Sequence, residues 1–128
     1  MKDDGGNMEK KDIKVRTKDF ALQIIHLHPA LPKTTEAQVL GNQLLRSGTS
    51  VGAHYHEAQR AKSDADFINK IEGALQELNE TVYWLELLGD SRIVAMEKLN
   101  PLIKESDELL AIFVSIVKVV KERRIGKG

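Results

Sequence analysis

The segment SGTSVGAHYHEA, residues 47–58, places hydroxyl, imidazole and carboxylate side chains close together in the sequence. Such residues could form a phosphate-binding loop, a metal site or a nucleophile with its base. A phosphate-binding loop needs glycines between a strand and a helix, where backbone N–H groups can converge. SGTSVG has neither the Walker spacing nor a preceding strand pattern, so we do not expect a phosphate cradle here.

Metal and catalytic sites are also not predicted. His54 and His56 are two residues apart, so a helix would point them in different directions. A zinc protease needs two histidines four residues apart with a glutamate between them, and a di-iron bundle needs Glu-x-x-His on two helices. Neither pattern occurs, and the nearby serines have no residue that would orient a base or complete an oxyanion hole. We therefore predict a protein that is not an enzyme, with no catalytic residue, cofactor or metal.

The composition restricts the class of protein further. A chain of 128 residues suffices for one domain with its own core. The chain has no cysteine and a formal net charge of zero, so any basic surface must be local. No stretch approaches the ~20 apolar residues of a membrane span, and the N-terminus lacks the apolar segment of a signal peptide. We expect a cytoplasmic protein without membrane contact.

Apolar residues recur at steps of three and four along four segments, which is typical of α-helices. Each predicted helix is bounded by capping residues, a proline or a glycine, or by the extent of its apolar stripe: Thr17 to His28, Thr35 to Ala58, Ser63 to Gly89, and Met96 to Val120. Pro101 either kinks the last helix or marks its true first turn.

These elements predict an all-α fold, an antiparallel up-down four-helix bundle in which the second, third and fourth helices are long. Residues 1–12 mix charge with glycine, which predicts a mobile N-terminal tail. The bundle domain is predicted over residues 13–124, and residues 125–128 form a basic C-terminal tail. Helices longer than one small bundle requires favour self-association.

The second predicted helix carries glycines on one flank, at Gly41, Gly48 and Gly52. Each glycine inside a helix costs about 1 kcal/mol relative to alanine. Close packing must offset that cost. We therefore expect a neighbouring helix, from this chain or from another copy, to cross this face at short distance.

A polar pair is predicted between the second and third helices. A tight turn near Lys62 would set residues whose numbers sum to about 125 opposite each other. Arg46 would then lie within about one turn of Glu77 and Glu80. We predict that Arg46 pairs with these carboxylates and fixes the register of the two helices. The competing interpretation is that Arg46 is an exposed phosphate ligand.

Residues 43–88, QLLRSGTSVGAHYHEAQRAKSDADFINKIEGALQELNETVYWLELL, resemble the small bacterial four-helix-bundle family named after proteins encoded in intervening sequences of 23S rRNA genes. The resemblance extends more weakly from about Phe20 to Val120. The matching positions are Arg46, Ser50-Val51, Glu57, Ser63, Asp66-Phe67, Glu77 and Tyr83-Trp84-Leu85. Two positions depart from the family pattern, which usually has asparagine at His54 and often has glycine at Ala58.

The resemblance implies an up-down helical bundle and a ring-shaped homopentamer with no established catalytic activity. It also implies kinship with the accessory protein of diversity-generating retroelements. That protein is a similar pentameric barrel that binds nucleic acid and a reverse transcriptase.

Charge is distributed unevenly along the chain. Residues 63–90 carry one lysine against seven acids, whereas residues 116–128 carry five bases against one acid. The basic segment either complements the dipole of a helix C-terminus or forms, in a ring of copies, a phosphate-binding patch. Arg60 and Lys62 would then line a second ring. The candidate nucleic-acid-binding residues are Arg60, Lys62, Lys118, Lys121, Arg123 and Arg124.

Tyr83 and Trp84 are predicted as interface or core anchors rather than base-stacking platforms. The predicted function is that of a non-enzymatic homo-oligomer, pentameric by the family resemblance, that binds RNA or DNA through backbone phosphates. The alternative is a protein-interaction scaffold, or an accessory subunit for a partner protein such as a reverse transcriptase.

Overall fold

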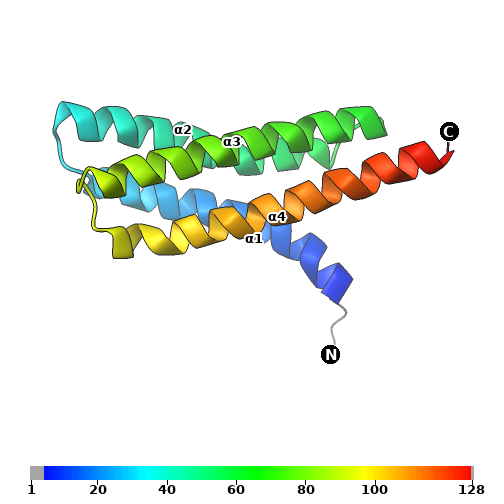
Figure 1. Cartoon of the computed structure of the whole chain (residues 1–128), viewed down its shortest axis with the longest axis horizontal. Helices are drawn as coiled ribbons and strands as arrows, with labels where there is room; N and C mark the ends of the chain where they lie inside the picture. The colour runs from blue at the N-terminus through cyan, green and yellow to red at the C-terminus, as the bar shows by residue number, and fades with distance from the viewer. Residues whose placement is uncertain (1–4, 128) are drawn as a thin grey trace.

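The structure, a computed structural model, describes residues 5–127 and consists of four long helices (Figure 1). The elements in chain order are α1 (Gly5–Leu27), the 3₁₀ helix η1 (His28–Ala30), α2 (Thr35–Ala58), α3 (Asp64–Asp90) and α4 (Met96–Lys127). Successive helices run in opposite directions, and no strand occurs within residues 5–127. The predicted all-α up-down bundle with long second, third and fourth helices is confirmed.

The starts of α2 and α3 follow from their capping residues. Ser63 caps α3 as predicted, because its side chain accepts a hydrogen bond of 3.0 Å from the backbone N–H of Asp66. The cap of α2 is Thr34 and not Thr35, since the Thr34 hydroxyl accepts from the N–H of Ala37 at 3.3 Å. The predicted cap was therefore wrong by one residue, because two adjacent threonines offer the same side-chain oxygen.

The first helix is longer than predicted. α1 begins at Gly5 and not at Thr17, whose buried hydroxyl donates to the Lys14 carbonyl at 3.2 Å. The chain between these two positions has no proline, and the residues after Gly6 include several good helix formers, so no signal stops the helix there. Of the tail predicted over residues 1–12, residues 1–4 lie outside the described residues.

The last helix also runs beyond its predicted end. α4 continues through residues 125–127 of the predicted C-terminal tail, and residue 128 lies outside the described residues. Pro101 lies inside α4, beyond its first turn, so it does not mark the start of the helix. Within residues 5–127 no helix is both long and apolar enough to cross a membrane.

The turn between α3 and α4 ends α3 with a Schellman motif. Arg92 has φ 64° and donates to the Gly89 carbonyl at 3.0 Å, while Ile93 donates to the Leu88 carbonyl at 3.1 Å. The predicted stop at Gly89 was therefore wrong. Gly89 is helical, and a side chain there would collide with Met96 at the start of α4. The glycine permits a close approach, and the left-handed residue that ends the helix is an arginine.

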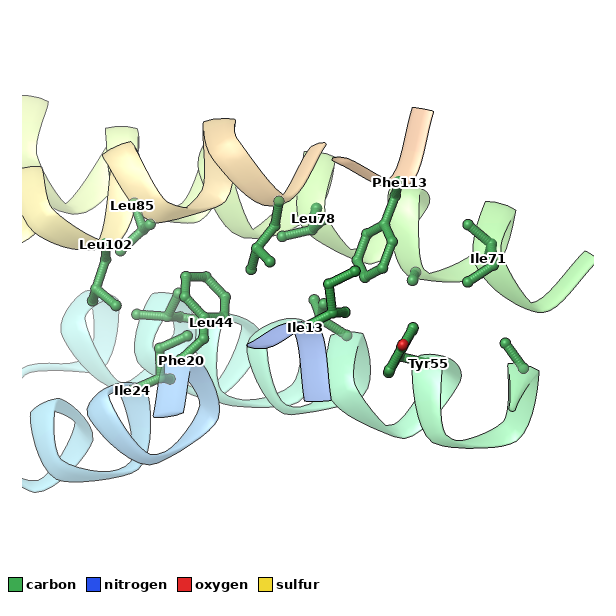
Figure 2. Close-up of a cluster of buried hydrophobic side chains, with 14 of the residues drawn as sticks. Ile13, Phe20, Ile24, Leu44, Tyr55, Ile71, Leu78, Leu85, Leu102 and Phe113 are labelled. Carbon is green, nitrogen blue, oxygen red and sulfur yellow. The ribbon is translucent and has the colours of Figure 1, made fainter. Parts of the chain in front are cut away.

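The core runs along the bundle axis and draws on all four helices (Figure 2). Figure 2 shows the side chains of Phe20, Leu44, Leu78 and Phe113 directed toward the middle of the bundle, and all four are essentially inaccessible to solvent. Burial of each such side chain stabilises the fold by roughly 1.5–3 kcal/mol. The three-and-four spacing seen in the sequence is therefore the spacing of the buried faces.

A pair of buried hydroxyl groups links α2 to α3 inside this apolar core. The Oγ1 of Thr81 lies 2.9 Å from the Oγ of Ser47 and 2.7 Å from the carbonyl oxygen of Glu77. Both side chains are fully buried. Because a buried hydroxyl without a partner is costly, this contact opposes sliding of α2 along α3.

One end of α1 departs from the bundle. α1 packs mainly against α2 and meets α4 only over a short stretch. Figure 1 shows its N-terminal turns pointing away from the other helices. Where α1 still meets α4, the guanidinium group of Arg16 binds both Glu105 oxygens at 2.8 and 2.6 Å and one Glu108 oxygen at 2.7 Å. This partly buried ion cluster fixes the point beyond which α1 leaves α4.

Candidate nucleic-acid interface

The predicted basic residues lie on two elements that meet at one end of the bundle. Arg60 and Lys62 belong to the turn between α2 and α3, while the remaining four lie on the last turns of α4: Lys118, Lys121, Arg123 and Arg124. Lys62 and Arg123 line one shared groove, so the two sets are adjacent. We call this region, residues 59–63 and 118–124, the C-terminal end of the bundle (Figure 1).

Two of the six basic side chains are paired with acids of α3. Lys121 lies 3.2 Å from Glu72, and Arg123 lies 3.2 Å from Asp64. Both pairs are substantially exposed, and such surface pairs contribute at most about 1 kcal/mol, so a phosphate could replace either carboxylate. The other four are exposed, and among the described residues their side chains show no ion pair: Arg60, Lys62, Lys118 and Arg124.

The groove between these elements has a volume of about 980 Å³ and mainly apolar walls. Its floor and sides include Tyr55 and Ala58 of α2, Phe67 of α3, and Ile112 and Ile116 of α4. The tilted rings of Tyr55 and Phe113, 5.8 Å apart, connect this floor to the core. Burial raises the pKa of the Tyr55 hydroxyl, a shift that its hydrogen bond with Gln59 opposes.

Arg46 lies against both carboxylates with which it was predicted to pair. Its Nη1 is 3.3 Å from the Oε1 of Glu77, and its Nη2 binds the Oε1 of Glu80. The hydrogen bond that Arg46 donates to Glu80 is the main cause of the raised pKa of the Arg46 guanidinium, and burial opposes this shift. The Arg46 side chain is half exposed, so the cluster lies at the surface of the α2–α3 seam. The role of this contact in fixing the register stays a prediction.

His54 extends the same polar cluster, which the sequence did not reveal. Its Nε2 lies 3.8 Å from Glu77, and its ring covers Gly73 so closely that a Cβ there would lie 2.9 Å from two ring atoms. The ring's Nδ1 is buried and has no hydrogen-bond partner among the described residues. The pairing of a glycine on α3 with a ring on α2 could have been found only by aligning the two helices residue by residue.

The glycine flank of α2 packs against α1 and the connector that follows it in the same chain. A Cβ at Gly41 would collide with Leu31, and a Cβ at Gly48 would collide with Ile24. At Gly52 the nearest atoms belong to Thr17, at 3.4 Å. The close approach predicted from the sequence is present, and this face is occupied by the same chain: α1 lies against Gly48 and Gly52, and the connector residue Leu31 lies against Gly41.

Tyr83 and Trp84 lie near the end of α3 that is remote from the C-terminal end. Tyr83 is 54% exposed, and its ring centroid lies 5.2 Å from that of Trp84 in an edge-to-face arrangement. Trp84 is partly buried, and its Nε1 is buried without a hydrogen-bond partner among the described residues. Their role as interface anchors stays a prediction.

Two hydroxyl groups of residues 47–58 bond to the backbone of their own helix. Thr49 and Ser50 donate hydrogen bonds of 2.7 Å to the Leu45 and Arg46 carbonyls of their own helix. In the described part of the chain no group of three or more histidine, aspartate or glutamate side chains could hold a metal ion. The hydroxyl groups of Thr49 and Ser50 therefore bond to carbonyl groups of α2.

Comparison with known proteins identifies the family of this fold. A crystal structure of a protein of unknown function from the S23 ribosomal protein family of Bacteroides thetaiotaomicron is 42% identical, with a TM-score of 0.78, over 83% of this chain and 98% of that chain. No curated protein matches the chain. The profile of the 23S rRNA-intervening sequence protein family matches residues 9–115. The chain therefore belongs to the 23S rRNA-intervening sequence protein family.

Proposed function

We propose that this protein is a non-enzymatic, homo-oligomeric helical bundle that binds RNA or DNA through backbone phosphates. The observation that supports the proposal is the meeting of two basic sets at the C-terminal end, although Lys62 and Lys118 are far apart in the sequence. Phosphate contacts need exposed cations and no base-reading groups, and that is what these turns offer.

Self-association would strengthen such binding. A neutral protomer attracts a polyanion weakly, but a ring of copies would carry the basic ends of all its members on one assembly. The pentamer implied by the family resemblance would combine five basic segments with a total charge of about +20. The acidic residues of α3 that pair with Lys121 and Arg123 lower this figure locally.

A salt titration tests the proposal. Binding of a labelled RNA hairpin and of a DNA duplex is measured by fluorescence anisotropy between about 50 and 200 mM salt. We expect affinity to fall steeply with salt and to depend little on base sequence, because counterion release dominates such binding. The variant Arg60→Gln/Lys118→Gln/Arg124→Gln should bind more weakly and flatten the logarithmic salt slope by about 0.9 for each lost contact on duplex DNA.

A matched control removes the same charge from the opposite end of the bundle. Lys33, Lys98 and Lys104 are exposed there, so Lys33→Gln/Lys98→Gln/Lys104→Gln should leave binding nearly unchanged. Absence of binding at about 50 mM salt, where phosphate contacts are strongest, would refute the proposal. Equal losses in the two triple variants would refute the assigned surface.

The second candidate function is a scaffold or an accessory subunit for a partner protein, such as a reverse transcriptase. The apolar groove favours a protein contact, because a phosphate backbone gains nothing from apolar walls. A pull-down with the tagged chain from its native host, repeated after nuclease treatment, separates the two functions. A partner retained without nucleic acid supports the scaffold.

A further inference from the structure

The groove exists because α1 covers one face of α4 near Glu105 but does not cover the same face nearer the C-terminus of α4. Glu105, Glu108, Ile112 and Ile116 follow one another at steps of three and four, so they share one face of α4. Arg16 binds the first two of these residues. Ile112 and Ile116 line the groove instead, with Ile13 of α1 at its edge. The bundle therefore lacks its fourth helix at the C-terminal end.

The chain's own N-terminal segment does not suit this space. Residues 5–12 read GGNMEKKD, in which Met8 is the only large apolar residue. The walls of the groove include Phe67 of α3 and Ile112 and Ile116 of α4, and polar residues placed against these apolar side chains would lose their water without gaining partners. An occupant must therefore bring its own apolar side chains from another molecule.

Basic residues at the rim of the groove favour an occupant with acidic residues. Lys62 and Arg123 line the groove, and the exposed bases Arg60 and Arg124 are adjacent to them in the sequence. Asp64 also lines the groove but is paired with Arg123. An occupant with an apolar centre and acidic edges would complement such a rim.

A surface of that kind lies on the same molecule. Tyr83, 54% exposed, is followed on its face of α3 by the exposed acids Glu86 and Asp90. Trp84 packs against Tyr83 edge to face. We call these four residues the aromatic patch. Along α3, Tyr83 is about 28 Å from Asp64 at the groove, so one copy cannot bring its patch to its own groove.

We propose that the aromatic patch of one copy docks in the groove of a second copy, head to tail. This inference rests on the self-association proposed above and identifies the surfaces that carry it. The two surfaces differ, so the contact is heterologous, and a pair of copies retains one free groove and one free patch. The same contact can therefore repeat, and it forms a ring when the rotation closes. A stable contact buries about 800 Å² on each partner, roughly a tenth of the 7825 Å² surface of this chain.

The experiment uses one variant for each surface. The groove variant is Ala111→Glu/Ser115→Glu, because both residues line the groove and are exposed, so the isolated fold tolerates the change. The patch variant is Tyr83→Ala/Glu86→Lys. The respective controls make similar exchanges elsewhere on exposed helix positions: Ala95→Glu/Asn100→Glu, and Val39→Ala/Glu36→Lys.

Mass is measured by light scattering over a range of concentrations, with circular dichroism to verify folding. The wild type and both controls should exceed the 14.3 kDa of one chain, whereas each surface variant should require at least tenfold higher concentration to associate. An equimolar mixture of the two surface variants should form a dimer, because one intact groove meets one intact patch.

The outcomes separate the two proposals. A wild type that is monomeric would overturn the proposed self-association together with this inference. A wild type that associates, with variants that associate equally well, would overturn the head-to-tail pairing alone. A mixture that stays monomeric would do the same, because it would show that the groove and the patch do not bind each other.

Discussion

The buried hydroxyl pair between Ser47 and Thr81 allows a prediction with a defined asymmetry. A hydroxyl carries one proton, and the Glu77 carbonyl, 2.7 Å from Thr81, can only accept. We therefore assign the Thr81 proton to that carbonyl, so that the 2.9 Å contact between the two hydroxyl oxygens is a hydrogen bond donated by Ser47. The other acceptor near Ser47 is the Leu44 carbonyl, at 3.5 Å, which is too long for a good hydrogen bond.

Removing the Thr81 hydroxyl should then lower the free energy of unfolding more than removing the Ser47 hydroxyl. Thr81→Val keeps the shape but leaves the Ser47 proton buried without a good acceptor, so we expect a loss of about 1–2 kcal/mol in the free energy of unfolding. Ser47→Ala leaves Thr81 bonded to Glu77, and alanine favours the helix, so its cost should be under about 0.5 kcal/mol. The double variant should be more stable than Thr81→Val, because the orphaned hydroxyl is gone.

Urea unfolding followed by circular dichroism measures all four proteins at one concentration, at which the oligomeric state is checked by light scattering. The double-mutant cycle should give a coupling energy of about 1 kcal/mol. The reasoning would be refuted if Ser47→Ala cost as much as Thr81→Val, or if the two effects simply added.

Three further predictions concern single positions. Gly48→Ala should lower the free energy of unfolding by about 1–2 kcal/mol because its Cβ meets Ile24, whereas Gly126→Ala, whose Cβ would meet no atom, should raise it slightly; urea midpoints compare them. Arg92→Gly should stabilise the fold by about 0.5 kcal/mol, because glycine adopts φ 64° without strain; an unchanged or lower melting temperature would contradict this. The raised pKa of Tyr55 means that the unfolded chain loses that proton first, so stability is intact below the unfolded pKa and falls as the pH rises through the folded pKa. The alkaline loss should be smaller in Tyr55→Phe.

The helices could be predicted because their signals are local. Apolar spacing and the Ser63 cap depend on residues a few positions apart, and these features fixed the four elements and the start of α3. The ends of the helices were predicted less well, because neighbouring residues offer similar signals. Gly89 resembled a stop, but it accommodates Met96, and the left-handed position fell on Arg92.

The candidate site was predictable in part for the same reason. The antiparallel register placed Arg46 near Glu77 and Glu80 by counting from one turn. The departure of α1 from α4 could not be derived in this way, because it depends on where Arg16 meets Glu105, far away in the sequence. The groove that results could therefore not be predicted from the sequence.

The contact between Gly48 and Ile24 constrains how this pair of positions can change together. Any side chain at position 48 needs space that the terminal methyl group of Ile24 now fills, and both residues are buried. A relative with alanine at the first position should therefore carry a shorter residue, such as valine, at the second. A larger side chain at position 48 should thus be accompanied by a smaller one at position 24. Ile24→Val should restore the stability that Gly48→Ala loses.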